Sequence, residues 1–277
     1  MLDDKLITFA KTKSPGCVSS PEDMLQFGCL QYAINNEYFD EYSKFGWIPY
    51  FSEEEKNNTV NNQETFSYYM SDIGFRGQYP SVNDKQLLAS FGCSVAFGQG
   101  LPEDKIYAKL IAQHYNKKYL NLGIPGASCH RIALTFSAAV RVWDIETAII
   151  NLPPFTRFHY CDSTNHLQSI LLSYDIDLPD LENVRKDIIK HFSNQFLASQ
   201  SIDAIQWIID IAKSRNIKIV LASWDLDTIQ LVKLAFDLDI LKFNTIDQAR
   251  DKHPGSESHK VFADNVIKIL TSETYTC

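Results

Sequence analysis

The segment FGCSVAFGQG, residues 91–100, joins an apolar run to a helical pattern and places Ser94 at the junction. The preceding residues KQLLAS predict a buried strand, and residues 102–115 predict a helix. Enzymes with an α/β sheet often present an attacking hydroxyl at such a Gly-rich turn from strand to helix. Many other proteins simply turn there, so Ser94 predicts chemistry only if suitable partners exist elsewhere in the chain.

Strand and helix patterns alternate along the rest of the chain. Apolar runs of strand length alternate with helical stretches, and this order predicts an α/β fold whose parallel sheet is covered on both faces. The further strands are expected at 118–123, 147–152, 217–223 and 240–243. The further helices are expected at 128–143, 181–215 with a break near 199–201, 227–236 and 258–270. In such sheets ligands bind at the carboxyl ends of the strands, which is where Ser94 would lie.

The first 85 residues do not follow this repeat. They are rich in aromatic residues and asparagine, and they include the polar stretch SEEEKNNTVNNQE. We therefore expect two parts, an N-terminal extension (1–85) packed on the main domain and the α/β domain itself (86–277).

Composition excludes several classes of partner. The 277 residues carry a formal net charge of −8 and no lysine- or arginine-rich run, which argues against a nucleic-acid partner. No signal peptide and no apolar stretch of membrane-spanning length is visible, so a cytoplasmic protein with no membrane partner is expected. The six cysteines show no CxxC spacing and are expected as free thiols. No cofactor is predicted, and the oligomeric state stays open.

Two other segments could supply partners for Ser94. In ARDKHPGSESH, Asp251 precedes His253 by two residues, and a carboxylate beside an imidazole can hold the tautomer of a general base. In NLGIPGAS, Gly126 lies just before the expected helix start at Ser128, where backbone N–H groups suit an oxyanion. Each of these segments also has an ordinary reading as a turn or a helix cap.

These segments resemble successive sequence blocks of the SGNH (GDSL-type) hydrolase family. FGCSVAFGQG, NLGIPGAS and DKHPGSESH match three blocks, and SDIGFRGQYP is similar to the N-x-x-G-x-R segment that precedes the nucleophile in many members. The resemblance covers roughly residues 68–270. It implies a three-layer α/β/α sandwich with a mostly parallel five-stranded sheet of flavodoxin-like type.

The resemblance also implies a role for each matching residue. Ser94 would be the nucleophile, and its own N–H would form part of the oxyanion hole together with the N–H of Gly126. Asp251 and His253 would complete a Ser-His-Asp triad.

The chain departs from the family pattern at three places. Cys93 stands where the nucleophile block usually has aspartate, and its side chain is expected to point away from that of Ser94. The stretch INLPPFTRFHY lacks the usual Gly-x-Asn-Asp, because Asn151 comes too early and is expected inside the strand. Thr156 and Arg157 are the alternative oxyanion donors there.

The third departure concerns the acid of the triad. The usual Asp-x-x-His is shortened to Asp-x-His, and Asp247 is the fallback acid. Arg157 is also a candidate for binding an acidic substrate, or else a structural ion-pair partner. His159 is the second candidate for contacts with substrate.

The remaining polar residues have weaker functional signals. In HYCDSTNH, the residues His159, Cys161, Asp162 and His166 match no common zinc spacing, so no metal site is predicted and a loop shaping the substrate pocket is expected. His259 is expected to be structural. Asp225 and Asp227 are expected to cap a helix.

The sequence thus favours a serine esterase that forms an acyl-enzyme. The family resemblance implies small acyl groups, such as acetyl on carbohydrate, as the substrate class. Acyl transfer on the same triad is one alternative. A catalytically silent glycan-binding or structural module is the other, favoured by the missing third-block asparagine.

Overall fold

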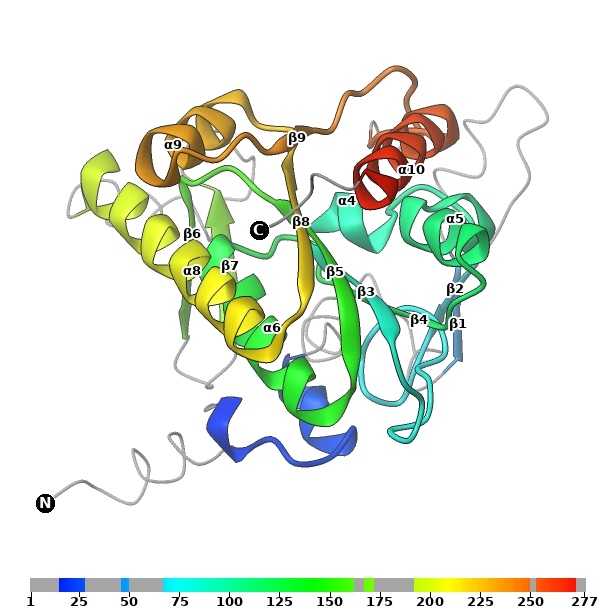
Figure 1. The fold of residues 1–277 in the computed structure, drawn as a ribbon. Coiled ribbons are helices and arrows are strands. Elements are labelled where there is room, and N and C mark those ends of the chain that lie inside the picture. Colours follow the sequence, from blue (N-terminus) through cyan, green and yellow to red (C-terminus); the bar gives the residue numbers. More distant parts are fainter. Residues whose placement is uncertain are drawn as a thin grey trace, which may run out of the picture.

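Five parallel strands form the central sheet, in the order β4-β3-β5-β8-β9 (Figure 1). The computed structural model describes residues 15–27, 46–49, 67–161, 167–171, 192–249 and 253–272. The strands are β3 (Leu87–Gly92), β4 (Tyr119–Gly123), β5 (Ile145–Leu152), β8 (Lys218–Ser223) and β9 (Leu241–Lys242). The predicted fold class, an α/β fold with a parallel five-stranded sheet, is confirmed.

Helices cover both faces of this sheet (Figure 1). One face carries α4 (Ser94–Phe97), α5 (Tyr107–His114) and α10 (Ser256–Thr271), and α5 and α10 lie side by side. The other face carries α6 (Cys129–Val142), α8 (Asn194–Arg215) and α9 (Leu226–Phe236).

Successive residues of β3 show this two-sided burial directly. The Ser90 hydroxyl is 2.8 Å from the Tyr107 hydroxyl of α5, whereas the Phe91 ring packs edge-on against Phe136 of α6 at 5.2 Å. Alternate side chains of a strand point to opposite faces, so both faces of β3 are covered. All six residues of this strand are buried, which explains its continuous apolar run.

The chain order of the strands reverses at β3. The chain runs from β3 outward to β4 and then returns past β3 to β5. The carboxyl ends of β3 and β5 therefore flank the point where ligands bind in open α/β sheets. Ser94 directly follows β3, so the topology puts it at this point.

Smaller elements complete the described parts of the chain. They are the 3₁₀ turns η1 (Pro15–Cys17), η2 (Glu22–Phe27) and η4 (Glu103–Lys105), and the antiparallel hairpins β1–β2 (Gly46–Pro49, Ser67–Met70) and β6–β7 (Arg157–Cys161, Leu167–Leu171). Buried side chains of η2 and β2, among them Phe27 and Met70, join the core formed by the sheet. None of the helices in the described ranges is long and apolar enough to cross a membrane.

Three local expectations need correction. The helix predicted over 102–115 divides into η4 and α5, because Ile106 is extended between them. Helix α8 continues through residues 199–201 without a break, since three serine and glutamine residues do not interrupt its i to i+4 ladder. Residues 181–191 lie outside the described part. Residues 159–161, expected in a loop, belong to strand β6, which pairs with β7.

Candidate active site

The predicted site residues gather at the carboxyl edge of the sheet. Ser94 follows β3, Gly126 follows β4, and Arg157 follows β5 after a short turn. His253 follows β9, in the loop that leads into α10. Parallel strands bring these four loops to one edge, as the sequence predicted.

The turn into α4 depends on a glycine. Gly92 has φ = +153°, and a Cβ added there would lie 2.7 Å from both the Asn151 carbonyl oxygen and the Ala96 Cβ. Any larger residue would push α4 away from β5. Gly98 then ends α4 in the left-handed region, and its N–H donates to the Ser94 carbonyl at 3.0 Å.

Ser94 is the first residue of α4 and is half-buried, whereas Cys93 beneath it is fully buried. Among the described residues, the Ser94 hydroxyl contacts only the Cys93 sulfur, at 4.0 Å, which is at most a weak hydrogen bond. Since only Ser94 of the pair reaches solvent, the geometry favours Ser94 over Cys93 as the group that a substrate could approach.

Two backbone N–H groups are unoccupied, one on the loop of the nucleophile and one on the loop of the second block. Within the described ranges, neither the Ser94 N–H nor the Gly126 N–H has an acceptor. Gly126 has φ = +80°, and the Ala127 N–H closes this turn on the Ile124 carbonyl at 3.0 Å. Free N–H groups of this kind are the donors that an oxyanion requires.

The second block is fixed against the nucleophile segment. The Ile124 N–H donates to the Gly92 carbonyl at 2.9 Å. A Cβ at Gly123 would overlap the Phe97 nitrogen and the Ala96 carbonyl carbon of α4. The Asn121 amide donates to the Phe97 carbonyl at 3.2 Å and accepts the Gly123 N–H at 3.1 Å. The two loops that carry Ser94 and Gly126 therefore hold each other in place.

The third block, Leu152–Phe155, has its backbone polar groups occupied. The Ser223 hydroxyl at the end of β8 donates to the Leu152 carbonyl at 2.9 Å, and the Ser201 hydroxyl of α8 donates to the Phe155 carbonyl at 3.1 Å. The Thr228 hydroxyl of α9 has one proton for two acceptors, the Asp225 carboxylate at 2.7 Å and the Pro153 carbonyl at 3.2 Å, and the bond to the carboxylate is the stronger. The Phe155 N–H donates to the Thr228 hydroxyl at 2.9 Å, and the two prolines have no N–H. No backbone N–H of this block is left for an oxyanion.

Arg157 is the side chain that connects the third block to the second. Its Nη1 donates to the Ala127 carbonyl at 3.2 Å, one residue after Gly126. Thr156 is half-buried in the turn before β6. Asn151 lies inside β5, as predicted, fully buried, with neither its Nδ2 nor its Oδ1 bonded within the described residues.

The histidine loop is anchored by Asp247. The Asp247 carboxylate accepts the Ser258 N–H at 2.7 Å, the Glu257 N–H at 3.1 Å and the Ser258 hydroxyl at 2.6 Å, and so caps the start of α10. Burial raises the pKa of the Asp247 carboxyl, but these bonds outweigh it and leave the pKa below its usual value. His253 is half-buried in this loop, and its carbonyl accepts the Ala249 N–H at 2.7 Å.

The predicted triad acid, Asp251, lies outside the described residues. Asp247, the fallback, is described and is occupied as a helix cap. Asp251 therefore stays the predicted acid.

His259 is a buried residue of the core. Its Nδ1 accepts the Tyr107 N–H at 3.2 Å, and its ring stacks on that of Tyr107 at 5.5 Å between centroids. Burial lowers the pKa of His259 to about 3, so the imidazole is neutral at ordinary pH. With no exposed surface, it cannot exchange a proton with a bound substrate.

The other predicted residues lie as follows. His159 and Cys161 belong to β6, and Asp162 and His166 fall outside the described part. Among the described residues, no group of three or more His, Cys, Asp or Glu could hold a metal ion. Asp225 caps α9 by accepting the Thr228 N–H at 2.9 Å, as predicted.

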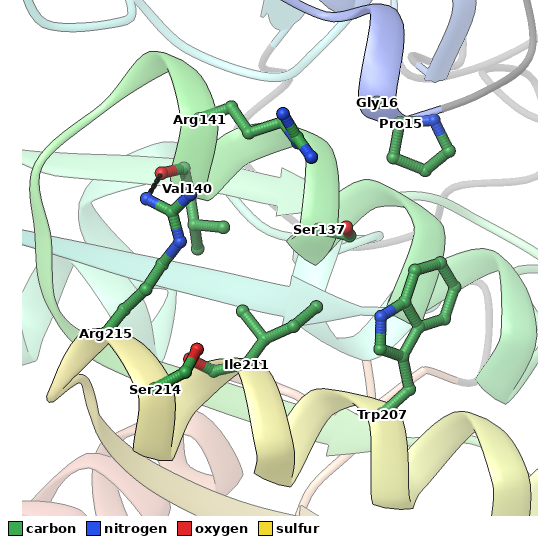
Figure 2. A pocket seen from close by; sticks show the side chains of 9 residues that line it. All are labelled: Pro15, Gly16, Ser137, Val140, Arg141, Trp207, Ile211, Ser214 and Arg215. Carbon is green, nitrogen blue, oxygen red and sulfur yellow. Dashed lines mark hydrogen bonds between the residues drawn. The ribbon is translucent and has the colours of Figure 1, made fainter.

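A pocket of about 360 Å³ lies away from this edge, between α6, α8 and η1. Figure 2 shows it between the Trp207 indole and Pro15, with the Arg215 guanidinium turned to the Val140 carbonyl. It is lined by the carboxyl-terminal turns of α6 and α8, and none of the predicted catalytic residues contributes to it.

Sequence reasoning missed one residue of the nucleophile segment's surroundings. Arg76, from SDIGFRG, is buried and donates to the carbonyls of Phe97 at 2.9 Å, Gly98 at 2.6 Å and Leu101 at 2.5 Å. The available signal was its place in the segment that precedes the nucleophile, which named the residue without giving it a role.

The sequence matches no family model and no curated protein. Among solved structures, the chain is similar to the acetyl xylan esterase Est2A from Butyrivibrio proteoclasticus, at 12% identity over 74% of this chain and 68% of that one, with a TM-score of 0.47. It is also similar to a lipolytic G-D-S-L family protein from Veillonella parvula, at 15% identity over 67% and 98%, with a TM-score of 0.41. A third is the esterase EstA from Pseudoalteromonas sp., at 11% identity over 66% and 96%, with a TM-score of 0.42. The likeness is distant in each case.

Proposed function

We propose that this protein is an ester hydrolase of SGNH type with Ser94 as its nucleophile. The observation that supports this most directly is the half-exposed Ser94 hydroxyl at the start of α4, on a segment bonded to the loop of Gly126, with the N–H groups of Ser94 and Gly126 lacking an acceptor in the described residues. His253 lies on the same edge of the sheet. A nucleophile, oxyanion donors and a base are the minimum that acyl transfer requires.

The proposed reaction has two steps. His253 takes the proton of the Ser94 hydroxyl as its oxygen attacks the ester carbonyl, and the N–H groups of Ser94 and Gly126 stabilise the oxyanion. His253, oriented by Asp251, then gives the proton to the leaving alcohol. Water, deprotonated by His253, attacks the acyl carbon; the bond to the Ser94 oxygen then breaks, this oxygen takes the proton back from His253, and the acid is released.

The third oxyanion donor would be a side chain. The backbone of Leu152–Phe155 is occupied, so Arg157 and Thr156 are the candidates, and Arg157 already reaches the second block through Ala127. Loss of one donor lowers kcat by about 10²- to 10³-fold in serine hydrolases, so the identity of this group matters. We propose small acyl esters of carbohydrate as substrates, with Arg157 and His159 contacting them.

Active-site labelling tests the proposal. The protein is treated with a fluorophosphonate, digested, and searched for the adduct by mass spectrometry. We expect the adduct on Ser94, and its loss in Ser94→Ala and His253→Ala. Cys93→Ala serves as the matched control and should still be labelled, because the Cys93 side chain is buried. Absence of any adduct on folded wild-type protein would refute the hydrolase.

One observation favours the silent binding module instead. The third block offers no backbone donor and no asparagine in the usual place, which would weaken an oxyanion hole. Binding of acetylated and deacetylated oligosaccharides without turnover, together with no labelling, would support that function.

Acyl transfer is separated from hydrolysis by adding a sugar acceptor and measuring how the acyl group divides between acceptor and water.

A further inference from the structure

We propose that Arg76 is a positioning residue that holds Ser94 in place through the far end of α4. This inference rests on the proposed role of Ser94. Arg76 comes from the segment before the sheet, and its side chain is 3% exposed. Its two terminal nitrogens donate to three carbonyl groups where α4 ends, those of Phe97, Gly98 and Leu101.

Among the described residues, Glu103 acts on the charge of Arg76 only at longer range. In the part of the chain that the structure describes, no carboxylate lies within ion-pair distance of its guanidinium. Burial lowers the pKa of Arg76, yet a guanidinium stays charged in proteins. The rings of Tyr68 and Phe97 lie 4.6 Å and 5.3 Å from its central carbon. Backbone carbonyls and aromatic faces are therefore the main groups that offset its burial.

The contact reaches Ser94 because α4 is only four residues long. The Gly98 carbonyl accepts from Arg76, while the Gly98 N–H donates to the Ser94 carbonyl at 3.0 Å. The Phe97 carbonyl also accepts from Arg76, while the Phe97 N–H donates to the Cys93 carbonyl at 3.0 Å. A shift at the end of α4 is thus passed directly to the peptide groups on either side of the nucleophile.

The same segment braces this turn at a second point. The Tyr68 hydroxyl accepts the Gly100 N–H at 2.7 Å. Arg76 itself is held beside β2, since it forms a bridge with Met70 and the following Gly77 N–H donates to the Tyr69 carbonyl at 2.8 Å. Residues 67–77, which precede the five-stranded sheet, thereby form part of the nucleophile's support.

A guanidinium is suited to this task and an ammonium is not. Arginine presents several N–H groups in one rigid plane and can serve three carbonyls at once, whereas lysine offers a compact charge on a flexible stem. Arg76→Lys therefore keeps the charge and removes the geometry. Arg76→Met removes both.

The test compares these variants with a matched pair at Arg131. Arg131 is also buried, donates to the Phe27 carbonyl at 2.8 Å and lies 6.0 Å from the Phe27 ring, on the opposite face of the sheet. For each variant we measure the thermal midpoint, kcat and KM with p-nitrophenyl acetate, and the rate at which a fluorophosphonate labels Ser94.

Arg76→Lys and Arg76→Met should lower kcat and the labelling rate by about 10- to 100-fold with KM within about twofold, since small misplacement of a reacting group has effects of this size. Arg131→Lys and Arg131→Met should lower the thermal midpoint and leave kcat unchanged. If Arg76→Met does not fold, Tyr68→Phe removes the second brace and should lower kcat by a smaller factor. An Arg76→Lys protein with wild-type kcat and labelling rate would overturn the positioning role.

Amide hydrogen exchange separates this inference from the proposed function. If the wild-type protein does not react with the probe, the proposed hydrolase function is refuted. The support of α4 by Arg76 can still be tested by amide exchange at Gly98 and Gln99, whose N–H groups both donate to the Ser94 carbonyl. Arg76→Lys should speed exchange there at least about tenfold and Arg131→Lys should not. Equal protection in the two variants would overturn the inference independently of activity.

Discussion

The two backbone segments that meet at the site, the turn around Ser94 and the third block Leu152–Phe155, are held in place in opposite ways. Around Ser94, glycines let main chains approach one another closely, as at Gly92 beside Asn151. At the third block, prolines fix the chain, hydroxyl groups from β8 and α8 donate to its carbonyls, and the Thr228 hydroxyl of α9 accepts its Phe155 N–H. The first segment keeps free N–H groups, and the second keeps none.

This difference indicates where the chemistry can reside. A segment with unoccupied N–H groups can stabilise a developing negative charge, whereas a segment with occupied ones can only shape the site. In this protein the oxyanion hole would therefore depend on the Ser94 and Gly126 side, with the third block contributing through a side chain such as Arg157.

The largest effect is expected from Gly123→Ala. The added methyl group would overlap the backbone of Ala96 and Phe97, so α4 must move away from β4. Overpacking of this kind lowers the free energy of unfolding by about 3 kcal/mol. Chemical denaturation of the variant and the wild type measures the loss, and labelling of Ser94 should fall with it.

A loss of less than about 1 kcal/mol would contradict the close contact between β4 and α4. Wild-type labelling in a destabilised variant would show that Ser94 tolerates displacement of α4. Either result would contradict the contrast between the closely packed turn around Ser94 and the third block.

A smaller effect is expected at the third block from Thr228→Val. The change keeps the shape of the side chain, but it leaves the Phe155 N–H without its acceptor and removes the bond from the hydroxyl to the Asp225 carboxylate at 2.7 Å. An unsatisfied, buried donor costs about 1–3 kcal/mol, which denaturation would detect. Labelling of Ser94 should change less than in Gly123→Ala, because the third block supplies no backbone donor.

Thr135→Val is the matched control for this change. Thr135 is equally buried, and in the described parts of the chain its hydroxyl donates only to the Arg131 carbonyl of its own helix. Its loss should cost about 0.5 kcal/mol, since that carbonyl is also within the helical ladder. Equal losses for the two threonine variants would show that the hydroxyl of Thr228 does not hold the third block.

Local sequence signals predicted the turn around Ser94 better than they predicted the third block. Glycines between a strand and a helix are a short-range signal, and the order of strands and helices placed Ser94, Gly126 and His253 at one sheet edge. The hydroxyl groups that bind the third block come from Ser201, Ser223 and Thr228, at least 46 residues away in the sequence. No local pattern relates a threonine on a later helix to a particular carbonyl, so only the folded chain reveals this network.

Arg76 shows the same limit of local sequence patterns. Arg76 was noticed as a motif position, but its three carbonyl partners lie 21 to 25 residues later. The buried face of α5 is another example, and it includes Tyr107 and Ile111. The tertiary contacts of α10, including the stack of His259 on Tyr107, select that face.

Apart from the control Thr135→Val, the smallest effect at neutral pH is expected from His259→Asn, which lies on the same face of the sheet as α4. The oxygen of the introduced amide can replace Nδ1 as acceptor for the Tyr107 N–H, so about 1 kcal/mol should be lost at about pH 7.5, mainly from the ring stack. The pKa of His259 is about 3 in the folded state, against about 6.5 in an unfolded chain. The unfolded state therefore binds one more proton between these two values.

The direction in which stability changes with pH follows from this difference in proton binding. The contribution of neutral His259 to stability is present above about pH 6.5 and is lost as the pH falls, by about 1.4 kcal/mol per pH unit. The amide side chain introduced by His259→Asn does not titrate, so the variant should lose less stability in acid, and the difference from wild type should narrow and then reverse below about pH 6. Groups that do not interact with His259 contribute equally to both proteins and cancel in the difference. If the unfolding free energies of wild type and His259→Asn ran parallel between about pH 4 and pH 7, His259 would not be held neutral in the core. Any loss of stability in acid would then have to arise from another group.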